Sequence, residues 1–321
     1  MKREEKLKTL IINAVNFQSE TVTDEYLENV VKTYVPKKLY KYKKIDKYCF
    51  NQIKEQYAWF SKFSDVDDQL EYTVNYDSKV FQEKLGEVLD ENIEYLLQEL
   101  MEKKSNIKTN VNAIRAIKDE YLRTSEQNQK PKGQTKLENI LLDKLKDVRE
   151  KNKVFCLSED YDNDAMWSLY AGGHKGFCIE YNIEKVFEQN YNSSMLYYLW
   201  PVIYKKNKTF DMFEFFKPIL QNIFNIPITE ELNKEQQILL NQNLFTKSYS
   251  WRWQNEWRFF LNEVDNKVDF PLISAIYIGD KMSEYNKKRI LNISQKYKYK
   301  VYQQQINRIG SDYEYKLIYE P

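Results

Sequence analysis

The sequence KSYSWRWQNEWRFFL, residues 247–261, changes from a polar loop into an aromatic strand pattern. Trp257 and Phe259 fall on one side of a period-two pattern, which predicts a strand with one face in the core. Glu256 therefore stands at the start of this strand. Gln254, two residues earlier, points to the same side if the backbone is extended.

A carboxylate at the start of a strand has two interpretations. It can project from a rigid edge into a cleft, where it would be shielded from bulk water. It can also be an ordinary solvated side chain, as a glutamate before a strand commonly is. The rest of the sequence is needed to decide between a site residue and a surface residue.

The composition excludes some classes of protein. The chain has 321 residues, with 49 Lys+Arg against 48 Asp+Glu, so its net charge is +1. No global field therefore favours nucleic acid or an anionic membrane, although local patches are not excluded. Seven glycines and seven prolines in this length favour long helices over many tight turns.

The cysteines and the single histidine do not form a recognisable zinc site. Cys49, Cys156 and Cys178 lack C-x-x-C spacing, and an odd, widely spaced set is typical of a reducing compartment. The first residues lack an apolar signal core, and no run approaches 18 apolar residues. We expect a soluble cytoplasmic protein with no membrane partner and leave its oligomeric state open.

The domain organisation follows from the helical periodicities. Residues 1–35 are expected to form an N-terminal helical segment that ends at Pro36. Residues 36–321 are expected to form one α+β domain. Apolar side chains at helical spacing predict large helical insertions at about 78–150 and 209–246.

Short period-two runs predict the sheet, and one helix lies between two of its strands. That helix, residues 164–171, has Asp164 at its start, and a second is expected from Asp280 to about residue 295. Strands are predicted at residues 39–43, 57–61, 154–158, 177–181, 200–204, 257–261, 275–279, 300–303 and 316–319.

Two loops carry groups that could bind ligands. Gly172-Gly173-His174-Lys175-Gly176 could hold a phosphate through its backbone N–H groups, or its glycines could serve only a left-handed turn. The acidic loop with Asp65, Asp67 and Asp68 could ligate a divalent cation. It could equally be a solvated turn or a helix cap.

Taken in order, these segments resemble the bacterial domain-of-unknown-function 2971 (DUF2971) family. The most specific part is Met166-Trp167-Ser168-Leu169-Tyr170-Ala171 with His174-Lys175-Gly176-Phe177. The other matching segments are Leu39-Tyr40-Lys41-Tyr42, Trp59-Phe60-Ser61, Cys156-Leu157-Ser158-Glu159, Val202-Ile203-Tyr204, Trp253-Gln254-Asn255-Glu256-Trp257-Arg258 and Ile276-Tyr277-Ile278-Gly279. Together they cover about residues 36–300.

Two segments depart from the family pattern. The loop after Trp59-Phe60-Ser61 usually reads Asn-Asp-Pro-x-Glu, whereas this chain has Ser64-Asp65-Val66-Asp67-Asp68. The family often has Glu-x-Glu, and this chain has Gln254-Asn255-Glu256.

The layout is similar to the ADP-ribosyltransferase fold, in particular to its branch that modifies nucleic acid. This likeness implies an α+β fold with a split β-sheet core, and NAD as the substrate. In that fold the final glutamate, here Glu256, stabilises an oxocarbenium-like transition state at the nicotinamide ribose. The residue two positions earlier, here Gln254, positions the acceptor.

The same likeness implies residues that bind NAD. The first core strand carries an Arg or His in that fold, and here the place falls to Lys41, which lacks the planar fork of Arg. Ser61 or Tyr57 would lie against the nicotinamide, and Trp251, Trp253 and Trp257 would wall its pocket unless they only pack the core. The implied cofactor-binding set is Lys41, Tyr42, Ser61, Trp59, His174, Lys175 and Arg252.

Three functional hypotheses follow. The first is an NAD-dependent mono-ADP-ribosyltransferase or an NAD-cleaving relative, modifying nucleic acid or protein in bacterial phage defence. The second is a non-catalytic module that binds nucleic acid or protein, with bases stacked on aromatic side chains. The third is a metal-dependent nuclease using Asp65, Asp67 and Asp68.

Overall fold

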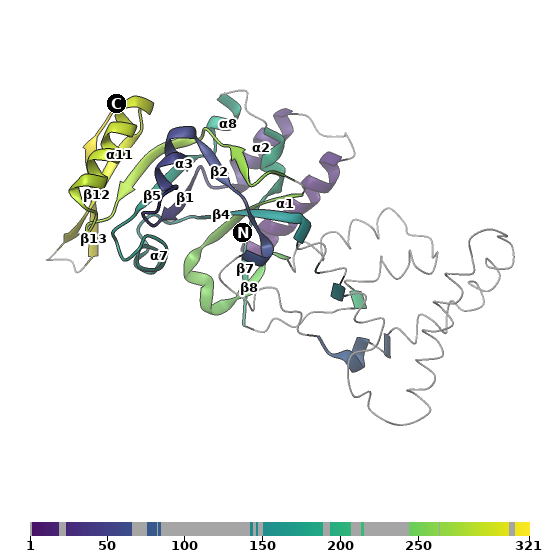
Figure 1. The fold of residues 1–321 in the computed structure, drawn as a ribbon. Coiled ribbons are helices and arrows are strands. Elements are labelled where there is room, and N and C mark those ends of the chain that lie inside the picture. Colours follow the sequence, from purple (N-terminus) through teal and green to yellow (C-terminus); the bar gives the residue numbers. More distant parts are fainter. Residues whose placement is uncertain are drawn as a thin grey trace. The chain divides into compact units, whose positions relative to one another are not determined.

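The fold is described from a computed structural model (Figure 1). The chain divides into two compact units, residues 1–67, 150–206 and 245–321 in the first and residues 68–149 and 207–244 in the second. The predicted insertions at about 78–150 and 209–246 lie mostly outside the described residues, and the account below concerns the first unit. The structure describes residues 2–18, 24–65, 76–81, 83–84, 142–143, 146, 150–188, 193–206, 213–214, 244–262, 264–307 and 312–321.

Among the described residues, nine strands form one mixed sheet, which confirms the α+β class. The strand order is β13-β12-β11-β5-β1-β4-β9-β6, and β3 also pairs with β4. Only the β11–β12 pair in this sheet is parallel. The strands are β1 (Lys38–Lys43), β3 (Ser61–Lys62), β4 (Asn152–Ser158), β5 (Phe177–Asn182), β6 (Leu199–Pro201), β9 (Glu256–Asn262), β11 (Ile273–Ile278), β12 (Lys300–Asn307) and β13 (Asp312–Tyr319).

Two small sheets and several helices surround the large sheet in the described part of the chain. β10 (Lys267–Asp269) pairs with β2 (Tyr57–Trp59), and β7 (Ile203–Lys205) pairs with β8 (Thr246–Ser248). The helices are α1 (Arg3–Gln18), α2 (Asp24–Tyr34), α3 (Cys49–Glu55), α7 (Asp164–Tyr170), α8 (Lys185–Glu188) and α11 (Glu284–Tyr297), with 3-10 turns η1 (Phe63–Asp65), η2 (Ser193–Tyr198) and η3 (Tyr249–Gln254). No helix among the described residues is long and apolar enough to cross a bilayer.

Two segments predicted as single strands are divided in the structure. The predicted strand at 57–61 breaks at Phe60, so that β2 pairs with β10 while β3 pairs with β4. The predicted strand at 200–204 breaks at Val202, and its halves pair with β9 and β8. Local alternation does not reveal such breaks, because each half is held by a different, distant strand.

Alternation along the strands gives the sheet two aromatic faces. Phe60, Phe155, Phe259 and Phe270 pack together on one face, with ring centres 5.4–6.5 Å apart. On the other face, Trp167 of α7 packs edge-on against Tyr42 of β1. Burial of such rings supplies much of the hydrophobic free energy of a domain this size.

The turn from α7 to β5 brings three backbones close together. A Cβ added to Gly176 would lie 2.1 Å from the carbonyl oxygen of Lys43. A Cβ added to Gly279 would lie 2.1 Å from the carbonyl oxygen of His174. Gly173 has a φ of +66° but open space around it. Gly176 is therefore required for close packing and Gly173 for backbone conformation.

We predict that Gly176→Ala lowers the free energy of unfolding by about 3 kcal/mol, because the added methyl group clashes with the β1 backbone. Gly173→Ala is the matched control and should cost about 1 kcal/mol, the usual penalty of the left-handed region. Urea unfolding measures both. Equal losses for the two variants would contradict the packing explanation.

Candidate active site

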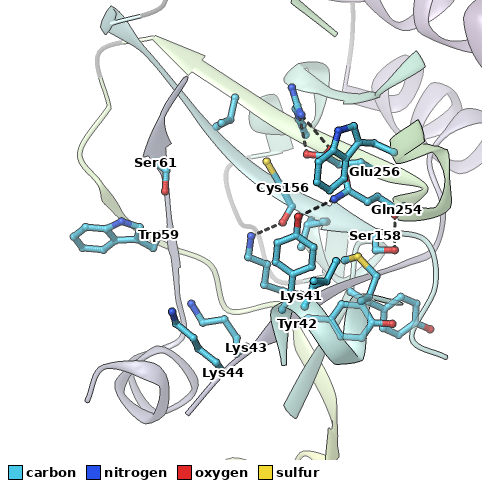
Figure 2. A pocket seen from close by; sticks show the side chains of 18 of the residues that line it. Lys41, Tyr42, Lys43, Lys44, Trp59, Ser61, Cys156, Ser158, Gln254 and Glu256 are labelled. Carbon is cyan, nitrogen blue, oxygen red and sulfur yellow. Dashed lines mark hydrogen bonds and ion pairs between the residues drawn. The ribbon is translucent and has the colours of Figure 1, made fainter. Parts of the chain in front are cut away.

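A pocket of about 700 Å³ lies on the sheet where β1, β3 and β4 meet (Figure 2). Its volume is within the range typical of small-molecule sites. The side chains that line it include Tyr40, Lys41, Tyr42, Lys43, Lys44, Asp46, Trp59, Ser61, Asp65, Cys156, Ser158, Met166, Leu169, Tyr170, Lys247, Trp251, Gln254, Glu256 and Arg258.

The pocket forms because two strands share one edge of β4. β1 pairs with β4 at Tyr40 and Ser158, whereas β3 pairs with it through Ser61 and Val154. Between these pairings the carbonyl oxygen of Cys156 accepts a hydrogen bond of 2.8 Å from Lys41 Nζ. At this point β4 is therefore bonded by the Lys41 side chain and not by the backbone of a neighbouring strand. The missing backbone leaves space beside β4.

Glu256 is positioned by a tight turn and by hydrogen bonds to its backbone. Asn255 adopts a left-handed conformation (φ 41°) between η3 and β9, and asparagine is among the residues that tolerate it. The Tyr204 hydroxyl accepts from the Glu256 N–H at 2.8 Å. The Glu256 carbonyl accepts from the Val202 N–H and from the guanidinium of Arg3.

The Glu256 carboxylate lies inside an ion-pair cluster and is only 6% exposed. Arg258 binds it through two nitrogens, with Nε 2.8 Å from Oε1 and Nη2 3.1 Å from Oε2. Lys247 Nζ lies 3.1 Å from Oε2. Burial alone raises the pKa of Glu256, but the charges of Arg258 and Lys247 outweigh it and hold the pKa well below its usual range.

Gln254 joins this cluster through both ends of its amide. Its Oε1 accepts a 2.8 Å hydrogen bond from Lys247 Nζ, and its Nε2 donates to the Tyr170 hydroxyl at 2.8 Å. Its backbone carbonyl accepts from Ser158 Oγ. Gln254 and Glu256 therefore both line the pocket, but through the turn at η3 and Asn255 and not through the extended backbone that the prediction assumed.

The lining of the pocket is cationic, with five basic side chains against three acidic ones. Lys41, Lys43 and Lys44 come from β1 and the residue after it. Burial, assisted by the nearby charge of Lys41, lowers the pKa of Lys43 to about 8. Such a lining favours an anionic group over a neutral one.

Six of the residues predicted for the site line this one pocket. Lys41, Trp59, Ser61, Gln254 and Glu256 are among them, and Trp59 is half-exposed at the mouth. Tyr42 is the sixth, but its hydroxyl is bound to the carbonyl of Asp160 at 2.8 Å.

The remaining three predicted residues lie elsewhere. His174 is buried, with its ring 4.9 Å from that of Tyr313 and its Nδ1 3.0 Å from the Gln304 side-chain oxygen. Lys175 is exposed in the same turn, and exposed Arg252 packs over the Tyr249 ring at 4.4 Å. None of the three is among the pocket's lining residues.

Three backbone donors of the glycine-rich turn are bound to carbonyls at the end of α7. The N–H groups of Gly173, His174 and Gly176 donate to carbonyls of residues 168, 167 and 171. These bonds end α7 in the manner of a helix cap. The turn therefore has a structural explanation, and those three N–H groups are not directed at a phosphate.

The three tryptophans have different environments. Trp251 lines the pocket. Trp257 is fully buried, with its indole N–H donated to Glu159, and lies on the opposite side of β9 from Glu256. The expectation that Trp257 walls the pocket is therefore wrong. Trp253 is half-buried and is not among the lining residues.

Sequence reasoning missed two residues at the centre of the cluster. Arg258 could have been found, because it lies two residues after Glu256 in the same strand and so on the same side. Lys247 had no such signal, since the pairing of its strand β8 with β7 is not visible in local sequence. Cys156 also faces this cluster, and burial with the Glu256 charge raises its pKa to about 12.

The acidic loop contributes only Asp65 to the described part of the site. Asp67 and Asp68 lie outside the described residues. In the portions of the chain that the structure describes, no group of three acidic, histidine or cysteine side chains is placed to hold a metal ion.

Fold and site together define a mixed α+β protein with a cationic pocket around a buried, ionised glutamate. A sequence family described as "Protein of unknown function (DUF2971)" matches residues 166–259. This segment runs from α7 into β9 and includes Tyr170, Gln254 and Glu256, whereas Lys41 and Ser61 precede it. Neither the curated proteins nor the solved structures contain a significant match to the chain.

We predict that Glu256→Gln costs about 3–5 kcal/mol of unfolding free energy at pH 7, because it removes the charge that buried Arg258 binds through two nitrogens. Since the folded-state pKa of Glu256 is depressed, its ionised form stabilises the protein above the ordinary carboxyl pKa of about 4.3. That stabilisation is lost as pH falls further. The difference in unfolding free energy between wild type and Glu256→Gln should therefore become smaller from pH 5 to pH 3.

Urea titrations at pH 7, 5 and 3 measure this difference. Glu55→Gln is a suitable control, because its ion pair with Lys267 is half-exposed and at the surface. If the loss of unfolding free energy caused by Glu256→Gln stayed constant with pH, it would contradict the conclusion that Glu256 is ionised in the folded protein.

Proposed function

We propose that this protein binds NAD in the pocket and cleaves the bond between nicotinamide and ribose, as ADP-ribosyltransferases do. The acceptor of the ADP-ribose would be a nucleic acid or a protein, with phage defence as the expected setting. The observation that carries the proposal is the shared pocket, in which Gln254 and ionised Glu256 lie with Lys41 of the first strand. Trp59 of β2 and Ser61 of β3 complete the set.

The chemistry needs an oriented carboxylate. When the C–N bond breaks, its electron pair leaves with nicotinamide and positive charge builds on the ribose. An oriented carboxylate in a dry site stabilises that charge by a few kcal/mol. Glu256 is buried, ionised and held in orientation by the two-point bond of Arg258. Because Arg258 and Lys247 offset its charge, its carboxylate would act as an oriented acceptor for a ribose hydroxyl and not as a free negative charge.

The pocket's cations suit the other end of NAD. The pyrophosphate carries two negative charges, and Lys43 and Lys44 line the pocket, as does Trp59 (Figure 2). The indole of Trp59 is 50% exposed and offers a surface on which a planar ring could stack. Lys41 is already bound to the Cys156 carbonyl, so its role would be to maintain the opening in the sheet.

The second candidate is a non-catalytic module that binds nucleic acid. Exposed Trp59 in a pocket that Lys43 and Lys44 also line favours it, because base stacking on aromatic rings together with phosphate contacts is typical of single-strand binding. Such binding would weaken steeply with salt and would not require NAD. It does not explain why a charged cluster is buried at the back of the same pocket.

We predict that the purified protein releases nicotinamide from NAD in the presence of cellular nucleic acid or protein. Glu256→Gln should reduce the rate at least about 100-fold, since one preorganised electrostatic group contributes this much. Chromatography of released nicotinamide measures the rate. Circular dichroism must show that the variant is folded at the assay temperature.

Arg252→Gln is the matched control, because this exposed side chain lies outside the pocket and should leave the rate unchanged. Equal nicotinamide release by wild type and Glu256→Gln would refute the proposed reaction. Salt-sensitive binding of an oligonucleotide without any turnover would favour the second candidate.

We also predict that NAD affinity falls as pH rises through about 8. Lys43, whose pKa is about 8 in the free protein, is charged below that pH and neutral above it. An anionic pyrophosphate binds the charged form better, so deprotonation weakens binding. Calorimetry from pH 7 to pH 9 should show the loss, and Lys43→Arg should abolish the pH dependence because arginine stays charged.

A further inference from the structure

The Lys247 ammonium occupies an enclosed site made of three different groups. Its Nζ lies 2.8 Å from Gln254 Oε1 and 3.1 Å from Glu256 Oε2. The same atom is 5.1 Å from the centre of the Trp251 ring. Lys247 is buried, and all four side chains belong to the pocket lining.

Neighbouring contacts fix the orientation of the groups around this ammonium. The Tyr170 hydroxyl accepts from Gln254 Nε2, and this directs the amide oxygen toward Lys247. Arg258 binds both oxygens of Glu256, and this fixes the carboxylate. The site would therefore keep its shape if the Lys247 side chain moved away.

An aromatic face beside a carboxylate and an amide oxygen is suited to an organic cation. Arg258 contacts both oxygens of the Glu256 carboxylate, and Lys247 contacts Oε2. Replacing the ammonium at Oε2 by another cation would leave the two hydrogen bonds of Arg258 in place.

We propose that Lys247 is an internal competitor for the cationic group of the ligand. Its ammonium fills the site formed by Trp251, Gln254 and Glu256 when the pocket is empty, and it withdraws when a ligand cation enters. The identity of that cation as the pyridinium ring of oxidised NAD rests on the proposed function. The competition itself rests only on the contacts of Lys247.

This arrangement makes the site sensitive to the charge of the ring that enters. A pyridinium ring that displaces the Lys247 ammonium would contact the Glu256 carboxylate and the face of the Trp251 ring. The neutral dihydropyridine ring of NADH gains much less and does not compensate for the displaced ion pair. Lys247 thus acts as a specificity-determining residue that favours the oxidised form.

The test compares wild type with Lys247→Met, which keeps the length and apolar stem of the side chain but removes its charge. Calorimetry would measure binding of NAD⁺, NADH and the N-methylnicotinamide cation. NAD⁺ and N-methylnicotinamide should bind the variant roughly tenfold more tightly than wild type, as the aromatic face and carboxylate become free for the ligand. The affinity for NADH should change by much less than this.

Lys206→Met is the matched control, because Lys206 also lies over an aromatic ring, that of Tyr249, but is exposed and outside the pocket lining. It should leave all three affinities unchanged. Weaker binding of both cations to folded Lys247→Met, or an equal gain for NADH, would overturn the proposal. So would failure of both cations to bind the folded variant.

These outcomes are separable from those of the proposed reaction. If N-methylnicotinamide binds Lys247→Met more tightly than wild type while wild type releases no nicotinamide from NAD, the proposed competition by Lys247 is supported and the proposed cleavage of NAD is refuted. If nicotinamide is released but Lys247→Met binds both cations more weakly, the reaction stands and Lys247 is a structural partner of Glu256.

Discussion

The ion pair between Glu256 and Arg258 is the interaction on which the pocket depends. Both side chains are buried on the same side of β9, and each charge is stabilised there by the other within hydrogen-bonding distance. The pair holds the carboxylate ionised and aimed at the pocket. Lys247 and Gln254 are arranged around that fixed charge, so the chemistry of the site follows from one buried contact.

The second requirement is the opening beside β4. Two short pairings hold β1 and β3 against one edge of that strand, and the Lys41 side chain supplies the hydrogen bond between them. A continuous ladder would have closed this space with backbone. Lys41 and Lys43 alternate to the opposite face of β1 from Tyr40, which shares its face with Glu256, and the same divergence lets them line the pocket together with the Glu256 cluster.

Local sequence predicted the main strands of the large sheet but neither β8 nor β10, and it did not predict which strands pair. Period-two alternation predicted β1, β5 and β9. Gln254 and Glu256 do line one pocket, but a 3-10 turn and a left-handed Asn255 bring them there, which their spacing did not predict. The breaks at Phe60 and Val202 were missed because each half-strand binds a different distant strand. Lys247 was missed for the same reason, whereas His174 drew attention by residue type although it packs between rings in a structural turn.

The most direct test of the account is hydrogen–deuterium exchange of the whole chain with and without NAD. If NAD occupies the pocket, protection should appear in peptides that cover β1 and the residues after it, β3, β4, and the segment from β8 to the start of β9. Peptides from β12 and β13, which contribute no residue to the pocket lining, should be unchanged. Protection confined to other segments, or none at saturating NAD, would contradict the central claim that this pocket is an NAD site.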